Sequence, residues 1–184
     1  MRLPMVFLVC SLTWRSVIAQ EATTANPSTV KAAFLKNFAR YVTWPARAFD
    51  SARAPWHIGV LGNASFCDVV EKTLRGRTEQ DRDFEVDCAE SLGKLPPCQI
   101  LFIAIGDAER RRAVLAELKG KPVLTVGDAP EFLQEGGVIR FQLGDRVQMS
   151  INLDQARSAS LTIQTKMLEV AREVWENGAM SRRR

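Results

Sequence analysis

The chain has 184 residues, of which 46% are hydrophobic, so it can bury one substantial core but is too short to argue for two domains. Its formal net charge of +4 falls to −1 when five arginines near the two ends are set aside, namely Arg2, Arg15, Arg182, Arg183 and Arg184. The body therefore lacks the clustered basic surface typical of nucleic-acid binding, and we expect no nucleic-acid partner.

The first nineteen residues have the features of a secretory signal peptide. Arg2 precedes an apolar run from Leu3 to Leu12, and Val17-Ile-Ala19 places small residues where a signal peptidase cleaves. An uncleaved membrane anchor is the alternative, but the run is shorter than the roughly 20 residues that span a bilayer, and Trp14-Arg15 interrupts it. We expect export with cleavage after Ala19 and no stable membrane insertion.

Residues 20–27 are small and polar, which predicts a flexible start before a single domain over residues 28–178 and a basic tail over residues 179–184. The domain begins with a helix that Ser28 can cap and that Trp44-Pro45 ends, because proline cannot continue the helical hydrogen bonds. Apolar residues recur along this helix at helical spacing: Val30, Phe34, Phe38 and Tyr41.

Apolar strands and helices alternate through the middle of the chain. Strands are predicted at residues 56–61, from residue 84, at 99–105 and at 122–126. Helices are predicted from Ser65 to about Leu74, from Ala108 to Lys119, and briefly after Asp128, with capping boxes at Ser65/Asp68 and Asp128/Glu131. Short glycine-bearing turns join these elements, and strand, helix, strand in this order indicates parallel crossover units.

The C-terminal part is predicted to differ from this pattern. Residues 138–143 and 146–153 alternate between apolar and polar side chains and are joined through Gly144-Asp145, which indicates an antiparallel hairpin with one solvated face. An amphipathic helix is predicted to close the fold at about residues 164–175. The predicted fold class is α/β: a three-layer, mostly parallel, open, Rossmann-like sheet of about six strands, with an antiparallel C-terminal hairpin and helices on both faces.

Three cysteines lie downstream of the predicted cleavage point, in what would be an oxidising compartment. Cys67 is expected at the start of the helix after the first strand and Cys88 at the end of the second strand, whereas Cys98 begins the third strand at the opposite edge. Since a disulfide needs Cα atoms within about 7 Å, Cys67 and Cys88 are the candidate disulfide and Cys98 the candidate free thiol. Alternatively, all three are buried as small apolar side chains.

The sequence offers no set of residues for catalysis. His57 is the only histidine and lies at the amino end of the first strand, away from the carboxyl ends where a catalytic histidine would be expected. A site with two histidine ligands is excluded, and we expect no catalytic residues, no metal and no cofactor. Carboxylates such as Asp107, Asp128 and Glu131 are better explained as helix caps or first-turn charges.

A ligand crevice is more plausible than an active site. The predicted helices starting at Ser65, Asp107 and Asp128 direct their positive ends to the carboxyl edge of the sheet, where open α/β sheets bind small molecules. The candidate crevice residues are Gly62, Asn63, Ser65, Gly106, Asp107, Gly127 and Asp128. The alternative is that these turns merely need glycine, since Gly59-Val-Leu-Gly62 is not the dinucleotide fingerprint and no phosphate-loop lysine is present.

Arginines occupy three consecutive positions at the start of the helix that follows Gly106. Arg110, Arg111 and Arg112 oppose the dipole of that helix. They are interpreted either as solvated charges or, for Arg110 and Arg111, as contacts to an anion or a protein partner.

Several stretches, in their order and spacing, together resemble the YfiR-like family of periplasmic proteins. They are Lys31-Ala-Ala-Phe-Leu-Lys-Asn-Phe-Ala-Arg-Tyr-Val-Thr-Trp-Pro45, Ile58-Gly-Val-Leu-Gly62 with Phe66, Cys98-Gln-Ile-Leu-Phe-Ile103, Pro122-Val-Leu-Thr-Val-Gly-Asp128, Gly136-Gly-Val-Ile139 and Ile151-Asn-Leu153. The resemblance covers about residues 30–172.

The resemblance implies a non-enzymatic regulator. Characterised members of the family repress an inner-membrane diguanylate cyclase by contacting its periplasmic sensor domain, which restrains cyclic-di-GMP synthesis and biofilm formation. The resemblance also implies a homodimer and an outer-membrane lipoprotein that can sequester the repressor. The partner surface is expected to be apolar and to include the amino-terminal and closing helices. The alternative function is a periplasmic sensor of a nucleotide or amino acid that signals to a histidine kinase or transporter.

Overall fold

Within residues 26–182, nine strands form one sheet, in the order β11-β10-β8-β7-β6-β5-β2-β4-β3. The computed structural model describes residues 26–182, so the predicted signal peptide and most of the predicted flexible start lie outside the described residues, as do Arg183 and Arg184. At the centre of the sheet, Ile58 pairs with Val86 on one side and with Ile100 on the other.

The central strands are parallel, as the alternation of strands and helices predicts. They are β4 (Arg82–Ala89), β2 (Trp56–Leu61), β5 (Ile100–Ile103), β6 (Leu124–Gly127) and β7 (Ile139–Leu143). The predicted hairpin is confirmed, because β7 pairs antiparallel with β8 (Val147–Asn152). A separate two-stranded sheet joins β1 (Val42–Thr43) to β9 (Thr162–Ile163).

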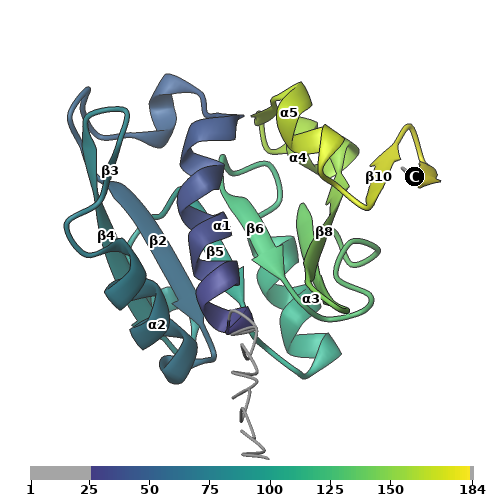
Figure 1. Cartoon of the computed structure of the whole chain (residues 1–184), viewed down its shortest axis with the longest axis horizontal. Helices are drawn as coiled ribbons and strands as arrows, with labels where there is room; N and C mark the ends of the chain where they lie inside the picture. The colour runs from purple at the N-terminus through teal and green to yellow at the C-terminus, as the bar shows by residue number, and fades with distance from the viewer. Residues whose placement is uncertain (1–25, 183–184) are drawn as a thin grey trace, which may run out of the picture.

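Helices cover both faces of the sheet (Figure 1). On one face lie α1 (Pro27–Tyr41) and α2 (Ala64–Leu74), and α4 (Leu153–Ser158) and α5 (Thr165–Glu169) add Ala156 and Met167 to the same core. On the other face lies α3 (Ala108–Glu117), whose Leu115 packs in a second core. Two 3₁₀ turns, η1 (Ala46–Ala48) and η2 (Leu92–Lys94), complete the elements.

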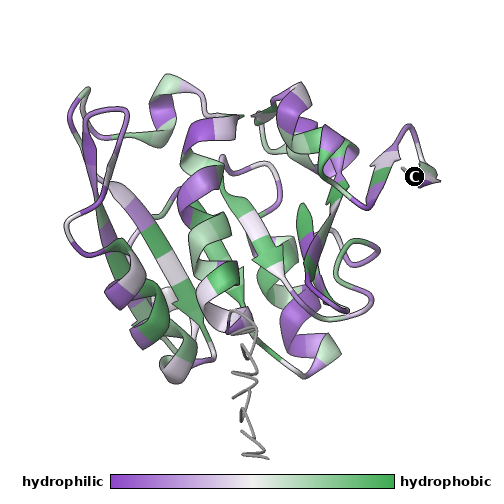
Figure 2. Cartoon of the chain, in the orientation of Figure 1, coloured by the Kyte–Doolittle hydropathy of each residue, from purple (hydrophilic) through white to green (hydrophobic). Residues whose placement is uncertain are grey.

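Strand β5 shows why this sheet needs helices on both sides. Ile100 and Phe102 belong to the core under α1 and α2, whereas Leu101 and Ile103 belong to the core under α3. Successive side chains of a strand point to opposite faces, so an unbroken apolar run fills both cores. Figure 2 shows a related contrast, because the central strands are coloured mainly hydrophobic and the helices alternate between hydrophobic and hydrophilic segments. The predicted fold class is confirmed.

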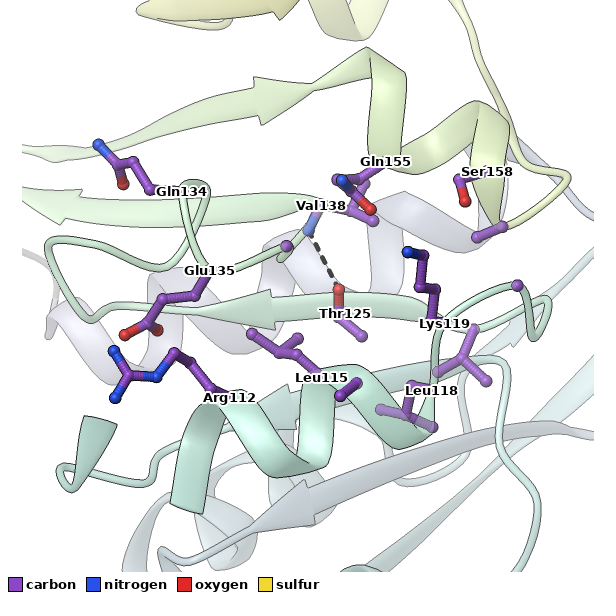
Figure 3. Close-up of a pocket in the computed structure, with 15 residues that line it drawn as sticks. Arg112, Leu115, Leu118, Lys119, Thr125, Gln134, Glu135, Val138, Gln155 and Ser158 are labelled. Carbon is purple, nitrogen blue, oxygen red and sulfur yellow. Dashed lines mark hydrogen bonds between the residues drawn. The ribbon is translucent and has the colours of Figure 1, made fainter. Parts of the chain in front are cut away.

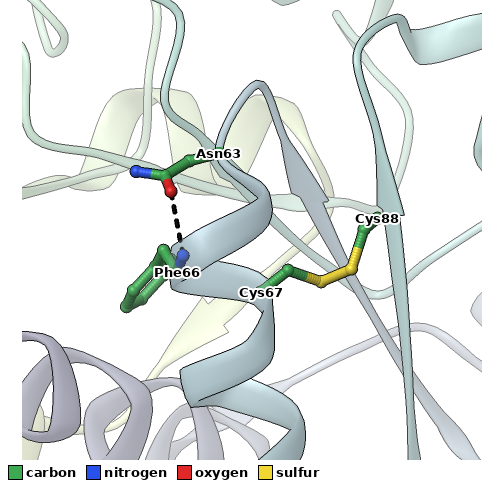
Figure 4. Close-up of a disulfide and its surroundings, with 4 residues drawn as sticks. All are labelled: Asn63, Phe66, Cys67 and Cys88. Carbon is green, nitrogen blue, oxygen red and sulfur yellow. Dashed lines mark hydrogen bonds between the residues drawn. A yellow bond between two sulfur atoms is a disulfide. The ribbon is translucent and has the colours of Figure 1, made fainter.

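The caps of α1 and α2 differ from the predicted ones. Asn26 rather than Ser28 caps α1, and its Oδ1 accepts the Ser28 N–H at 2.9 Å. Pro27 occupies the first helical position, where its missing N–H costs no hydrogen bond. Asn63 rather than Ser65 caps α2, with its Oδ1 accepting the Phe66 N–H at 2.8 Å (Figure 4). In both cases the helix begins earlier than the serine that was expected to cap it.

The chain before β4 forms a strand where a polar turn was predicted. Strand β3 (Thr78–Glu79) pairs antiparallel with the start of β4, around Gln80 and Asp81, which have φ values of 54° and 57°. Aspartate tolerates the left-handed region better than most residues, which makes this tight turn accessible.

The short helix predicted directly after Asp128 does not form. Residues 130–136 make turns, with Phe132 N–H donating to the Ala129 carbonyl at 3.1 Å and Gly137 N–H returning to the Phe132 carbonyl at 2.8 Å. The Phe132 ring fills the space beside Gly127 and Gly137, where an added Cβ would collide with it. The Phe132 ring is fully buried in these turns.

The predicted closing helix is wrong beyond Glu169. The chain leaves α5 and enters β10 (Glu173–Glu176), which runs parallel to β8, and then β11 (Ala179–Arg182), which pairs antiparallel with β10. Asn177-Gly178 forms the turn with φ values of 53° and 71°, which is the two-residue hairpin signal. Most of the predicted basic tail is thus strand β11, and the sheet has more than the expected six strands.

Candidate functional site

The predicted crevice residues meet only in part. Strands β2, β5 and β6 end at one edge of the sheet, and there Gly106 and Asp128 line a cavity of about 300 Å³. Asp107 accepts the Arg110 N–H at 2.7 Å as the cap of α3, and Asn63 caps α2, so both side chains have structural partners. Ser65 is exposed and does not cap the helix.

The crevice prediction also assumed three helix ends at this edge, and one of them is missing. Asp128 precedes turns and pairs with Lys31, whose Nζ lies 2.8 Å from Oδ2. The Lys31 side chain is 10% exposed and extends from α1 to the end of β6, 97 residues away in sequence. Sequence reasoning missed Lys31, because a lysine among the apolar residues of α1 gives no signal of its distant partner.

Arg111 is not the solvated or partner-contacting side chain that the sequence suggested. It is 2% exposed, and its Nε and Nη2 donate to the two oxygens of Glu135 at 2.5 and 2.7 Å. Its Nη1 donates to the carbonyls of Ile105 and Gly106 at 2.9 and 3.1 Å. Arg111 is therefore buried and held by internal partners rather than directed at solvent or a partner protein. Arg110 is exposed and stays a candidate contact.

A disulfide joins Cys67 and Cys88, with Cα atoms 6.1 Å apart (Figure 4). Cys67 is buried in the first turns of α2 and Cys88 is exposed near the end of β4, so the bond fixes the helix to the outer part of the sheet. Cys98 is a free thiol. Burial raises the pKa of the Cys98 thiol to about 12, and the thiol is therefore protonated at neutral pH and a poor nucleophile.

An apolar groove lies between the start of α1, the β7–β8 hairpin and the end of α5. The groove encloses about 720 Å³ and is lined by Pro27, Val30, Phe34, Leu143, Gly144, Asp145, Arg146, Val147, Gln148, Met149, Glu169, Val170, Ala171 and Arg172. Two of its residues are large apolar side chains left in solvent, since Leu143 is 64% and Val170 68% exposed. Among residues 26–182, only Met180 shares this property.

The composition of the groove is typical of a protein-binding surface. Exposed Leu143 and Val170 stand beside the partly buried Phe34, and charged residues of both signs surround them at the rim. Exposed apolar patches with a polar rim mark protein interaction sites or ligand-binding grooves. The residues that line the groove come from the amino-terminal helix, from the region after α5 and from the β7–β8 hairpin. The hairpin contributes Leu143, which the predicted alternation of apolar and polar side chains had assigned to the buried face.

Comparison with known proteins gives one family. A family model described as YfiR/HmsC-like matches residues 28–172, well over half of the chain. No curated protein matches the chain. Within residues 26–182, no helix has both the length and the apolar character that crossing a membrane demands.

Proposed function

The chain belongs to the YfiR/HmsC-like family, and from this membership we propose that it is a non-enzymatic periplasmic regulator of an inner-membrane diguanylate cyclase. In this proposal it binds the periplasmic sensor domain of the cyclase and represses it. Repression lowers cyclic-di-GMP and, with it, biofilm formation.

The observation that carries the proposal is the extent of the family match. It runs from the first turn of α1 to the residue before β10, and thus includes every residue that lines the apolar groove except Pro27. The surface that suits a protein partner is therefore part of the family domain.

The cysteines support a periplasmic location and a role without catalysis. A disulfide between Cys67 and Cys88 fits an oxidising compartment, where such bonds persist. The third cysteine of the mature chain, Cys98, is half-buried and its pKa is raised to about 12, so it does not supply a reactive thiolate at neutral pH.

The apolar groove is the proposed contact surface for the cyclase. Leu143 and Val170 are already exposed in the described structure, so they can be covered by a partner without opening the core. Their burial against apolar side chains of the sensor domain would supply the central contacts, and Asp145, Arg146, Glu169 and Arg172 would form the polar rim.

Two further partners are proposed from the family membership. A second copy of the chain would form a homodimer, and an outer-membrane lipoprotein would sequester the repressor and release the cyclase. Light scattering of the purified mature protein tests the first, with twice the monomer mass expected. Co-purification with the lipoprotein encoded nearby tests the second.

The direct test is a binding measurement between purified proteins. The mature protein is titrated with the periplasmic domain of a diguanylate cyclase encoded in the same gene neighbourhood, and calorimetry is expected to show a saturable complex. The unrelated periplasmic domain of a histidine kinase serves as a control. Absence of binding to the cyclase domain, together with unchanged cyclic-di-GMP on deletion of the gene, would remove the proposal.

A further inference from the structure

A second hollow, the α3–α4 cavity, lies on the α3 side of the sheet and measures about 450 Å³ (Figure 3). One wall is a stripe that runs along α3 and the turn after it, with Arg112, Leu115 and Lys119 at helical spacing. The opposite wall is α4, which contributes Gln155 and Ser158. The family match and the proposed repressor function assign nothing to this cavity.

The floor of the cavity is mainly apolar, with one polar group. Leu115, Val123 and Val138 line it, together with Thr125 of β6. The Thr125 Oγ1 accepts the Val138 N–H at 3.0 Å, and the hydroxyl keeps its own proton to donate. A ligand resting on this floor would bury apolar surface and find a hydrogen-bond donor beneath it.

Several polar side chains around the cavity have no partner among the residues that the structure describes. Within residues 26–182, the structure shows no hydrogen bond or ion pair for the side chains of Arg112, Lys119, Gln134, Gln155 and Ser158. Figure 3 shows Lys119, Gln155 and Ser158 around one end of the hollow and Arg112 and Gln134 at the other end, and its only dashed line is the bond between Val138 and Thr125. A few polar groups, such as Lys119, Gln155 and Ser158, above an apolar floor are the usual composition of a small-molecule site.

The charges at the cavity favour an anion. Glu135 also lines the cavity, but both of its carboxylate oxygens accept hydrogen bonds from the buried Arg111, which neutralises it. The charges of Arg112 and Lys119 are left without a counter-ion in the described part of the chain, so the cavity is positive. Guanidinium and ammonium groups form their strongest hydrogen bonds with phosphate and carboxylate oxygens.

We propose that the α3–α4 cavity binds a small organic anion that carries hydroxyl groups, of about the size of a sugar phosphate. Lys119 holds the anionic group at one end of the cavity, Gln155, Ser158 and Thr125 beside it bind the hydroxyl groups, and Arg112 adds positive charge at the other end. The cavity volume of about 450 Å³ lies within the range of small-molecule sites, roughly 300–1,000 Å³. This proposal goes beyond the repressor function and does not depend on it.

The test uses the purified mature protein and a matched pair of probes. Glucose 6-phosphate and glucose differ only in the anionic group, so calorimetry is expected to show binding of the first and none of the second. Citrate, tested in parallel, distinguishes recognition of carboxylates from recognition of phosphate, and binding of either anion supports the proposal.

Variants tie the binding to the cavity. Lys119→Gln is expected to weaken binding about tenfold, which corresponds to the loss of one charge-assisted hydrogen bond, and Arg112→Gln, at the other end of the cavity, is expected to weaken it less. Both side chains are exposed, so the variants should fold normally, and denaturant unfolding checks this. Lys72→Gln removes the same charge from α2, on the opposite face, and should leave binding unchanged.

Three results would overturn the proposal: binding of glucose as tight as that of its phosphate, no binding of either anion, or full binding by Lys119→Gln and Arg112→Gln. Because no cyclase domain takes part, these results leave the proposed repressor function untouched.

Discussion

Arg111 and Glu135 form a bidentate ion pair inside the fold, with side chains 3% and 7% exposed and N–O distances of 2.5 and 2.7 Å. The pair joins the first turn of α3 to the glycine-rich turns that precede β7. It therefore fixes both the carboxyl edge of the sheet and one end of the α3–α4 cavity.

Arg111→Ala is expected to destabilise the protein strongly, by about 3–5 kcal/mol, because it leaves the Glu135 carboxylate buried without its partner. Urea unfolding followed by tryptophan fluorescence measures the effect. Arg110→Ala, an exposed neighbour on the same helix, should change the free energy of unfolding by less than about 0.5 kcal/mol. Equal effects of the two variants would contradict the structural role of Arg111.

Loss of the disulfide is expected to lower stability by about 3 kcal/mol, since the bond closes a loop between positions 21 residues apart. Cys67→Ser/Cys88→Ser and the reduced wild type should unfold at the same, lower denaturant concentration.

The reactivity of Cys98 is tested with a thiol reagent. The oxidised mature protein should react at Cys98 only after unfolding. Fast reaction of the folded protein near pH 8 would contradict the raised pKa of Cys98.

The acid stability of the protein should depend on Glu79. Arg40 donates from Nε and Nη2 to the two carboxylate oxygens at 3.0 and 2.9 Å, and these hydrogen bonds lower the pKa of Glu79 in the folded state. A lowered folded pKa contributes stability above the unfolded value of about 4.5, and this contribution is lost as the pH falls further. The free energy of unfolding of wild type should therefore decline below about pH 4.5.

Glu79→Gln should be less stable than wild type at pH 7 and should lose less stability on acidification. Glu90→Gln, an exposed site, is the control and should follow wild type. If the free energy of unfolding fell in parallel for wild type and Glu79→Gln between pH 7 and pH 3, the Arg40–Glu79 pair would not be the cause of the stability loss in acid.

Gly127→Ala is expected to destabilise the fold by about 1–3 kcal/mol, because an added Cβ would lie 2.5 Å from the buried Phe132 ring. Gly93→Ala is the matched control, since a Cβ there meets nothing within 4 Å. Thermal unfolding of the two variants distinguishes a packing effect from a general preference for glycine. Similar melting temperatures for both would contradict the packing account.

The apolar groove should be required for partner binding and dispensable for folding. Leu143→Glu and Val170→Glu place a charge on side chains that are already exposed, so stability should hold while affinity for the cyclase domain falls at least about tenfold. Met180→Glu changes the third exposed apolar side chain, on β11 outside the groove, and should bind like wild type. Unchanged binding by the groove variants would place the contact surface elsewhere.

Much of the fold could be predicted from local patterns. The unbroken apolar run around Phe102 indicated a strand buried on both faces, and Gly144-Asp145 between two alternating segments indicated the β7–β8 hairpin. The end of the chain could not be predicted in the same way. The spacing of Met167 and Ala171 fits a helix, and pairing of β10 with the distant β8 overrides it from Glu173 onward.

The candidate site was less predictable, because its main contacts join distant segments. Lys31 and Asp128 are 97 residues apart, and Arg111 and Glu135 are 24 apart. Because Asp128 and Arg111 lie next to turns, the sequence suggested that they contact solvent or a ligand. In the fold, each instead pairs with a residue of opposite charge, Asp128 with Lys31 and Arg111 with Glu135. The exposure of Leu143 was equally hidden, because the alternation of its strand assigned it to the buried face.

The most direct measurement is cyclic-di-GMP in cells that carry the gene, lack it, or lack it and express a variant. Deletion should raise cyclic-di-GMP, wild type and Met180→Glu should restore the low level, and Leu143→Glu/Val170→Glu should fail to restore it although the protein accumulates normally in the periplasm. Unchanged cyclic-di-GMP on deletion would contradict the proposed repression, and full restoration by the groove variant would contradict the role of the groove.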